Sequence, residues 1–199
     1  MPFLVPITDE LHTPKFYVFR AVSPRLGVSF ATKTMAQCFL KQNKKVLIFD
    51  ALLGLKNFPI FNKNSKKIPS VLTGQAPLTD LLIQENGIDI IAGIGNQNLT
   101  ALPPAQQQYI KMCLLQLAKN YDIVIIDMPF HVSEPIWEDL GENLWVISAN
   151  RNIIVDTLEA SKNQPQPHLV LNHQSKDLPL NQLYVFTKSL CPNCQITLL

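Results

Sequence analysis

The chain reads Phe16-Tyr17-Val18-Phe19-Arg20-Ala21-Val22, continues as Ser23-Pro24-Arg25-Leu26-Gly27-Val28-Ser29, and reaches Lys45-Val46-Leu47-Ile48-Phe49-Asp50 after a helical pattern over Ser29–Gln42. Aromatic and β-branched residues dominate the first and last of these segments, which predicts two β-strands. The apolar spacing between the loop and the last segment is that of a helix. The sequence therefore predicts a strand, a loop with one glycine, a helix and a second strand.

The same alternation of strands and helices continues to residue 172. Four further apolar runs predict strands at Ile88–Ile94, Asp122–Asp127, Leu144–Ser148 and His168–Asn172. Helical patterns alternate with them at Leu78–Gln84, Pro103–Asn120, Pro135–Leu140 and Ile153–Lys162. Strands that are apolar throughout are typical of a parallel sheet covered on both faces. We therefore expect an α/β fold with a mainly parallel, doubly wound sheet flanked by helices, whose central strands are Phe16–Val22, Lys45–Asp50 and Asp122–Asp127.

Length and composition favour a single domain. The 199 residues are 47% hydrophobic and 16% charged, which argues against extensive disorder. We assign residues 1–15 to an N-terminal extension, 16–175 to the α/β domain and 176–199 to a short C-terminal tail. A net charge of +2 is too small to indicate nucleic-acid binding. The sequence shows neither a signal peptide nor a bilayer-spanning apolar run, so we expect a cytoplasmic protein without stable membrane insertion.

The loop after the first strand lies where open parallel sheets bind ligands, at the carboxyl ends of the strands. A P-loop in this place binds phosphate through backbone N–H groups beside glycines, with a lysine on the phosphate oxygens and a serine or threonine on magnesium. Segment 23–29 has the preceding strand and the following helix of a P-loop, but it contains one glycine and no lysine.

Five later segments carry a family resemblance through their order and spacing. They are Asp50-Ala51-Leu52-Leu53-Gly54-Leu55-Lys56-Asn57, Ser70-Val71-Leu72-Thr73-Gly74, Leu78-Thr79-Asp80-Leu81-Leu82, Gly87-Ile88-Asp89-Ile90-Ile91-Ala92-Gly93 and Tyr121-Asp122-Ile123-Val124-Ile125-Ile126-Asp127-Met128-Pro129. Together they resemble the ParA/MinD superfamily of P-loop ATPases, and within it the flagellar-number regulators FlhG and FleN. The first is similar to the family segment Asp-x-Asp-x-Gly-Leu-x-Asn and the last to its Walker B strand. The resemblance runs from about Phe16 to Asn172 and implies the fold of this superfamily.

The loop departs from the deviant Walker A pattern Lys-Gly-Gly-x-Gly-Lys-Thr of that superfamily. Ser23 stands at the signature lysine, Pro24 and Arg25 stand at two glycines, and Val28 stands at the P-loop lysine. Leu52 replaces the aspartate that positions the attacking water in the family. The residues that remain at the degenerate nucleotide site are Gly27, Ser29, Asp50, Asp127 and Asn172, the last at the family's adenine-contacting position.

These substitutions predict that ATP hydrolysis is lost, because phosphoryl transfer depends on positioning and on neutralising phosphate charge. We expect no required cofactor, although Arg25 or Lys33 could supply positive charge for weak binding of ATP and magnesium. The remaining residues also have structural explanations. Gly27 suits a turn, Ser29 suits a helix N-cap, and Asp127 can cap the turn after its strand.

One hypothesis and two alternatives follow. The resemblance implies a catalytically inactive MinD/ParA/FlhG-like pseudo-ATPase that acts through a protein partner, and is compatible with a homodimer, in organising a bacterial flagellum, pilus, division site or partition complex. The first alternative is a divergent nucleotide-binding switch that uses Arg25 or Lys33. The second is a metal or redox module built on Cys191 and Cys194, a CxxC pair without a second pair.

Overall fold

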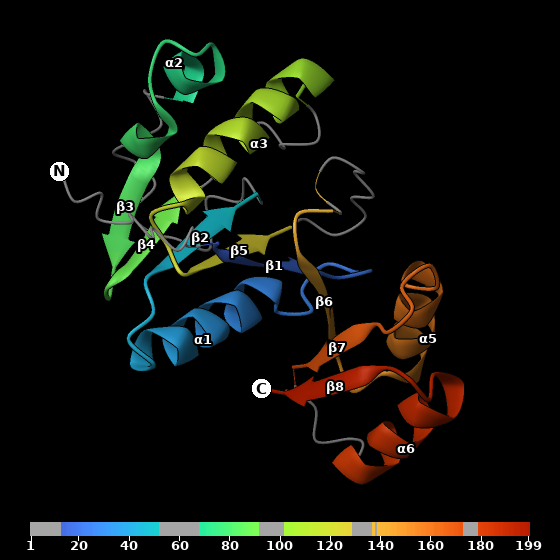
Figure 1. Cartoon of the computed structure of the whole chain (residues 1–199). Coiled ribbons are helices and arrows are strands. Elements are labelled where there is room, and N and C mark those ends of the chain that lie inside the picture. The colour runs from blue at the N-terminus through green and yellow to red at the C-terminus, as the bar shows by residue number, and fades with distance from the viewer. Residues whose placement is uncertain (1–12, 52–67, 92–101, 129–136, 138, 173–178) are drawn as a thin grey trace, which may run out of the picture.

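The computed structural model describes residues 13–51, 68–91, 102–128, 137, 139–172 and 179–199. These residues form an eight-stranded sheet in the order β3-β4-β2-β5-β1-β6-β7-β8 (Figure 1). The strands are β1 (Lys15–Arg20), β2 (Val46–Asp50), β3 (Leu82–Glu85), β4 (Ile88–Ile91), β5 (Ile123–Asp127), β6 (Glu142–Ile147), β7 (His168–Leu171) and β8 (Gln195–Leu198). All neighbouring strands are parallel except β3 and β4. The predicted mainly parallel sheet with β1, β2 and β5 at its centre is confirmed.

Helices cover both faces of the sheet, with α1 and α3 on opposite sides of it (Figure 1). They are α1 (Val28–Lys41), α2 (Ile68–Leu72), the 3-10 helix η3 (Leu78–Leu81), α3 (Pro104–Ala118), α5 (Arg151–Ala160) and α6 (Leu180–Leu190). Successive residues of β2 point to the two faces. Val46 and Ile48 pack with residues of α1, whereas Leu47 and Phe49 pack with residues of α3. A third apolar cluster joins α5 and α6 to the outer strands β7 and β8.

The predicted helix over Leu78–Gln84 is wrong beyond its first turn. Only η3 is helical, and the chain then forms β3, which pairs antiparallel with β4. The reason is the dipeptide Asn86-Gly87, whose φ angles of 51° and 81° belong to the two-residue turn that favours a β-hairpin. Glu85 and Ile88 on either side of this turn are paired residues of the ladder. The hairpin signal was therefore present in the sequence.

Residues 179–199, which the sequence analysis assigned to a short tail, form α6 and β8. Strand β8 pairs parallel with β7 and is the last strand of the described sheet. Pro192 lies in the turn between α6 and β8 and so interrupts neither element. The segment contributes to the third apolar cluster through side chains such as Leu183 and Cys194.

The remaining predicted helices and strands agree with the structure where it describes them. The helices predicted at Ser29–Gln42, Pro103–Asn120 and Ile153–Lys162 are α1, α3 and α5. Half of the predicted helix Pro135–Leu140, the last three residues of the predicted strand Ile88–Ile94, and residues 1–12 lie outside the described residues. No described helix combines the length and the apolar character that crossing a membrane requires.

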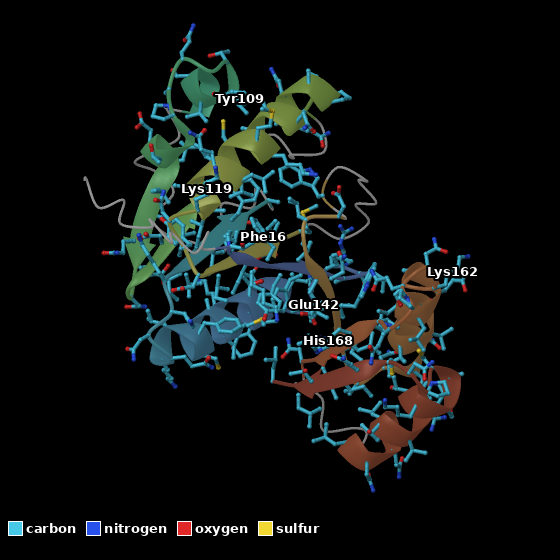
Figure 2. The ribbon with its side chains drawn as sticks, viewed as in Figure 1. Phe16, Tyr109, Lys119, Glu142, Lys162 and His168 are labelled. Carbon is cyan, nitrogen blue, oxygen red and sulfur yellow. The ribbon has the colours of Figure 1, made fainter. Side chains whose placement is uncertain are left out.

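A ladder of polar side chains links the three outer strands β6, β7 and β8. Glu142 and His168 lie side by side on neighbouring strands (Figure 2), with 2.7 Å between Glu142 Oε1 and His168 Nδ1. The other ring nitrogen, His168 Nε2, lies 2.8 Å from Thr197 Oγ1 on β8. One imidazole thus bridges a carboxylate and a hydroxyl across three strands, which fixes their register at this end of the sheet.

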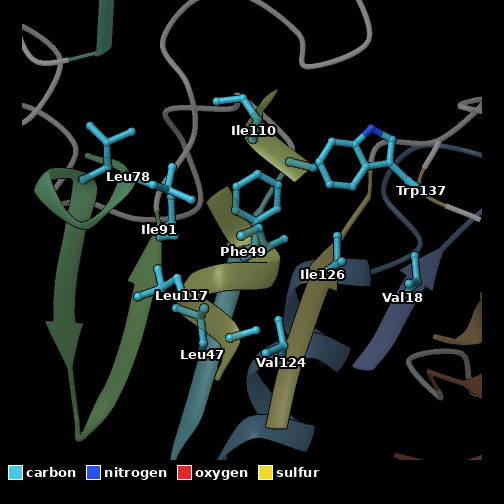
Figure 3. Packing of buried hydrophobic residues seen from close by; sticks show 14 of the residues in the cluster. Val18, Leu47, Phe49, Leu78, Ile91, Ile110, Leu117, Val124, Ile126 and Trp137 are labelled. Carbon is cyan, nitrogen blue, oxygen red and sulfur yellow. The ribbon is translucent and has the colours of Figure 1, made fainter. Parts of the chain in front are cut away.

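Trp137 is fully buried in the cluster under α3, although little else of segment 129–138 lies within the described residues. Its ring stacks on Phe49 with 5.9 Å between ring centroids, and its indole N–H donates to Gln107 Oε1 at 3.4 Å. Figure 3 shows the tryptophan beside Phe49 and Ile126 on this face of the sheet. Trp137 therefore anchors the connection between β5 and β6 to the core.

We predict that Trp137→Ala lowers the free energy of unfolding by about 3–5 kcal/mol, because it leaves a large cavity in a close-packed region. Trp145→Ala is the matched control, since the other tryptophan is partly exposed, and it should cost less. Urea denaturation followed by far-UV circular dichroism measures both values. Equal losses in the two variants would contradict the anchoring role of Trp137.

Candidate functional site

The loop between β1 and α1 uses a left-handed backbone at two positions. Gly27 has φ 85° and is the N-cap of α1, and its carbonyl accepts a hydrogen bond from the Ala31 N–H at 2.9 Å. Arg25 has φ 63°, a conformation that costs a non-glycine residue roughly 1–2 kcal/mol. The N-cap is thus Gly27 rather than Ser29, which is the second residue of the helix.

Val28, which the sequence analysis predicts to stand at the position of the P-loop lysine, is part of the core. Its side chain is only 8% exposed and belongs to the apolar cluster between α1 and the sheet. A lysine in the same orientation would bury a charge among apolar groups, at a cost of several kcal/mol unless the charge were paired. The first residue of α1 therefore contributes apolar packing in this protein and no phosphate-binding charge.

Asn172, at the carboxyl end of β7, lies against the loop. Its side chain is buried and its Nδ2 donates to the Leu26 carbonyl at 3.0 Å. A Cβ atom added to Gly27 would lie 2.0 Å from this Nδ2, so the side-chain amide occupies the space beside the glycine. The structure therefore brings Asn172 and Gly27 together. The contact also gives Gly27 a second reason, besides its positive φ, to lack a side chain.

Asp50 and Asp127 end the neighbouring strands β2 and β5 and are aligned with each other in the ladder. Both are buried, with exposed fractions of 3% and 0%. Ile48 and Ile125, two residues before them, pack in the cluster under α1, so the two carboxylates point to the same face as that helix.

The Asp127 carboxyl is in an unusual electrostatic environment. Burial raises its pKa to about 7, although the nearby Ser29 hydroxyl and the Lys33 charge both pull that pKa down. Within the described residues, neither carboxylate oxygen makes a hydrogen bond of standard geometry, and neither does the buried Thr32 hydroxyl. At neutral pH the carboxyl therefore exists in comparable amounts of its protonated and ionised forms.

The predicted site residues separate into two groups. Ser29 and Lys33 lie close enough to Asp127 to influence its pKa, whereas Arg25 is exposed and is not among the groups that do so. Thr32 was missed, although it lies three residues after Ser29 and one before Lys33, a spacing that places all three on one helix face.

A second missed residue is Arg20, at the end of β1. It is 5% exposed, and its Nε donates to Asn143 Oδ1 at 2.8 Å. Its neighbour Phe19 packs under α1, so Arg20 points to the opposite face of the sheet. An arginine inside an apolar strand was the available signal, because such a residue is rarely buried without a partner.

The magnesium-binding part and the phosphate-binding part of a nucleotide site are not equally well represented by these residues. Oxygen atoms of Ser29, Asp50 and Asp127 are of the kind that magnesium binds, and the Asp127 oxygens without hydrogen bonds fit such an ion. The loop does not fit a polyphosphate equally well, because Val28 brings no charge and Pro24 brings no N–H. Leu52, which the sequence analysis predicts to replace the water-positioning aspartate, lies outside the described residues.

Cys191 and Cys194 are not part of this site. They lie in the turn that precedes β8, at the amino end of an outer strand, whereas the two aspartates lie at the carboxyl ends of central strands. Because these strands are parallel, the cysteines and the aspartates are at opposite ends of the sheet.

The strand order, the loop after β1 and the paired strand-end aspartates define a P-loop NTPase fold of the MinD/ParA type, and comparison with known proteins agrees. No family model matches the sequence. A septum site-determining protein MinD of Emiliania huxleyi is 28% identical over 148 residues, and the match covers 68% of this chain and 49% of that protein.

Solved structures show the same fold. A plasmid partition protein of Borrelia burgdorferi superposes with a TM-score of 0.70 at 16% identity, covering 93% of this chain and 90% of that one. A chain of the MinC:MinD cell division protein complex of Aquifex aeolicus superposes with a TM-score of 0.67 at 18% identity, covering 92% and 79%.

The chain is therefore similar in sequence to a MinD protein and in fold to MinD and plasmid partition proteins, and it spans about half the length of the curated MinD protein that it matches. The closer resemblance to FlhG and FleN stays a prediction.

The raised pKa of Asp127 predicts a pH-dependent stability. Between its ordinary pKa of 3.8 and about 7, the folded state holds a proton that the unfolded state releases, so stability falls as the pH rises through this window. The full effect is on the order of 4 kcal/mol. Asp127→Asn should remove this dependence, so the variant gains stability relative to the natural chain as pH rises.

The measurement is urea denaturation of both proteins at intervals from about pH 4 to about pH 8, the range that brackets the two pKa values. Asp156→Asn is the matched control, because that carboxylate is exposed on α5. The control should follow the natural chain at every pH. A constant stability difference between Asp127→Asn and the natural chain would show that Asp127 does not titrate as described.

Proposed function

We propose that this protein is a pseudo-ATPase, which keeps the MinD/ParA shape, does not hydrolyse ATP, and acts through contacts with other proteins. The observation that carries the proposal is the burial of Val28 in the core at the place of the P-loop lysine. The contact of Asn172 with Leu26 and Gly27 supports the proposal, because the Asn172 side-chain amide already makes a hydrogen bond within the protein.

The free energies involved support a loss of ATP hydrolysis more strongly than a loss of ATP binding. Each missing lysine removes charge-assisted hydrogen bonds worth about 1.5–3 kcal/mol, so the two together weaken affinity by about a hundred- to ten-thousand-fold. The transition state loses more, because phosphoryl transfer is accelerated almost wholly by positioning and charge neutralisation. Pro24 adds to the loss, since it removes one backbone donor from the loop.

A protein partner is the expected target of the remaining surface. Phe30 follows directly after Ser29 in α1, and its ring is 53% exposed. A large apolar side chain at this place can contribute to a protein contact beside the degenerate site. The similar Aquifex aeolicus chain comes from a MinC:MinD complex, which supports a partner protein here as well. A homodimer is compatible with the same surface.

The cellular role follows from the relatives. The similar proteins determine the septum site or partition plasmids, as their names state. We infer that this protein helps to position a bacterial structure, of which a flagellum, a pilus, a division site and a partition complex are the candidates. Without an ATP gate, its contacts would be constitutive or controlled by the partner.

A second candidate function is a divergent nucleotide-binding switch, which one observation favours. Lys33 lies near enough to Asp127 to lower its pKa, so a cation is present beside the carboxylates even though position 28 is apolar. This lysine and Ser29 could hold a magnesium–nucleotide complex weakly. Arg25 could add charge from the exposed side of the loop. Calorimetric titration with ATP and magnesium distinguishes this switch from a protein that binds no nucleotide.

We predict that the purified chain releases no phosphate from ATP with magnesium above a protein-free blank. The physical reason is that Val28 and Leu52 stand where the family has its charge-neutralising and water-positioning groups. The Asp127→Ala variant is the control, and its phosphate release should equal that of the natural chain. Turnover that this variant abolishes would contradict the proposal, because it would locate hydrolysis at this site.

We further predict that Val28→Lys alone does not restore hydrolysis. Ser23 still provides no signature lysine, Leu52 still orients no water, and Pro24 still denies the phosphates a backbone donor. Residues that act as one catalytic unit are strongly non-additive, so repairing one of them recovers little. Binding of ATP by titration calorimetry can improve while phosphate release stays at the background.

Val28→Met controls for disturbance of the core, because it changes the packing without adding charge. Both variants are checked for folding by circular dichroism before the assay. Clear turnover in Val28→Lys but not in Val28→Met would mean that the rest of the catalytic site is intact.

A further inference from the structure

The turn between α6 and β8 brings the two cysteines of the CxxC segment together. The Cys194 N–H donates to the Cys191 carbonyl at 3.2 Å, which is the hydrogen bond of a four-residue turn. Such a turn holds its end Cα atoms within about 7 Å, a separation close to the range that a disulfide bridges. The Cys191 thiol is also close enough to raise the pKa of the Cys194 thiol.

The turn is fixed on both sides by regular structure. The Cys191 N–H donates to the Thr187 carbonyl at 2.9 Å, which ends α6, and the Gln195 N–H donates to the Pro167 carbonyl at 2.9 Å, which begins β8. The Lys188 ammonium donates to two carbonyls of the turn, those of Pro192 and Cys194. The proximity of the thiols is therefore imposed by the fold.

The two cysteines differ in their access to solvent. Cys194 is 1% exposed and belongs to the apolar cluster under α5 and α6, whereas Cys191 is partly exposed. Cys191 is therefore the more accessible of the two residues to an incoming reagent. This asymmetry gives the pair one attacking and one resolving thiol.

We propose that Cys191 and Cys194 are a redox-active dithiol, which forms an intrachain disulfide by exchange with a low-molecular-weight disulfide of the glutathione class. The Cys191 thiolate attacks one sulfur of that disulfide, which forms a mixed disulfide and releases one small thiolate. Cys194 gives its proton to solvent and attacks the Cys191 sulfur, which releases the second small thiolate. In balance, two protein thiols and one small disulfide become one protein disulfide and two small thiols.

The environment of Cys194 favours a durable disulfide over a catalytic one. Burial raises the pKa of this thiol, and the neighbouring Cys191 raises it further. A thiolate of high pKa is a poor leaving group, so reductive opening that releases Cys194 is slow. The same pKa makes the closing step faster as the pH rises, because the thiolate fraction of Cys194 increases.

The geometry favours this chemistry over a metal site. A structural zinc ion requires four ligands, of which the turn supplies two. Among the described residues, no group of three or more His, Cys, Asp or Glu side chains surrounds a place where a metal could bind.

The test uses the full chain and exploits the positions of its lysines. Trypsin cleavage after Lys188 yields a peptide, residues 189–199, that contains Cys191 and Cys194, while Cys38 and Cys113 fall in other peptides. The reduced chain is equilibrated with oxidised glutathione, quenched with iodoacetamide and analysed by mass spectrometry. We expect peptide 189–199 to be lighter by two hydrogen atoms and to carry no alkyl group. Reduction before the quench should restore both alkylation sites.

Two single variants test the assigned order of attack. Cys194→Ser should accumulate a stable glutathione adduct on Cys191, because no resolving thiol remains. Cys191→Ser should acquire much less adduct on the buried Cys194. Cys113→Ser is the matched control, and its peptide 189–199 should oxidise as in the natural chain.

The outcomes decide the proposal. A peptide 189–199 that carries two alkyl groups after equilibration with oxidised glutathione would overturn it. A disulfide between the 189–199 peptides of two chains would also overturn the intrachain form. So would stoichiometric zinc in the purified chain that is lost in Cys191→Ser, because bound zinc would occupy both sulfurs.

Discussion

Strand β5 is hydrogen-bonded between β1 and β2, and the position of the candidate site depends on this pairing. Five residue pairs align β5 with each neighbour, and every residue of β5 is buried. Because the three strands are parallel, their carboxyl ends meet at one edge of the sheet. Asp127 consequently lies beside Asp50, and the loop that leads to α1 starts at the same edge. The apolar faces on both sides of β5 then place α1 and α3, since each helix must cover one of them.

Much of this arrangement could be predicted from sequence, because the central strands are apolar throughout and the helices between them have regular spacing. The strands at the two edges of the sheet were harder to predict from the sequence. At β3 the propensity of Leu82 and Ile83 did not distinguish a helix from a strand, and the Asn86-Gly87 turn decided the outcome. At the other edge of the described sheet β8 pairs only with β7, and its alternation of polar and apolar residues extends over just four positions. The outer strands depend on tertiary contacts that short segments do not encode.

The candidate site also has features that the sequence predicts and features that it does not. Superposition of a family pattern on the sequence identified Gly27, Ser29 and the two aspartates. The structure places Ser29 near Asp127 and aligns Asp50 with Asp127, whereas a nucleotide-binding role for these residues stays a prediction. The contact of Asn172 with Leu26 could not be inferred, because 146 residues separate the partners in the chain. The burial of Val28 could not be predicted from the sequence either. A valine at the start of a helix can face solvent or core, and only the packing of α1 on the sheet selects the core.

Charge balance explains how the fold tolerates two buried carboxylates beside an apolar residue at position 28. Two carboxylates lie side by side at the ends of β2 and β5, and such a pair normally requires a nearby positive charge. With Val28 apolar, Lys33 is the cation that acts on Asp127, and it does not offset the effect of burial on the pKa. Asp127 therefore takes up a proton near neutral pH, and that proton neutralises charge which a metal ion or a P-loop lysine would otherwise neutralise. The buried carboxylates can thus be retained without nucleotide chemistry, so their presence alone is no evidence for hydrolysis.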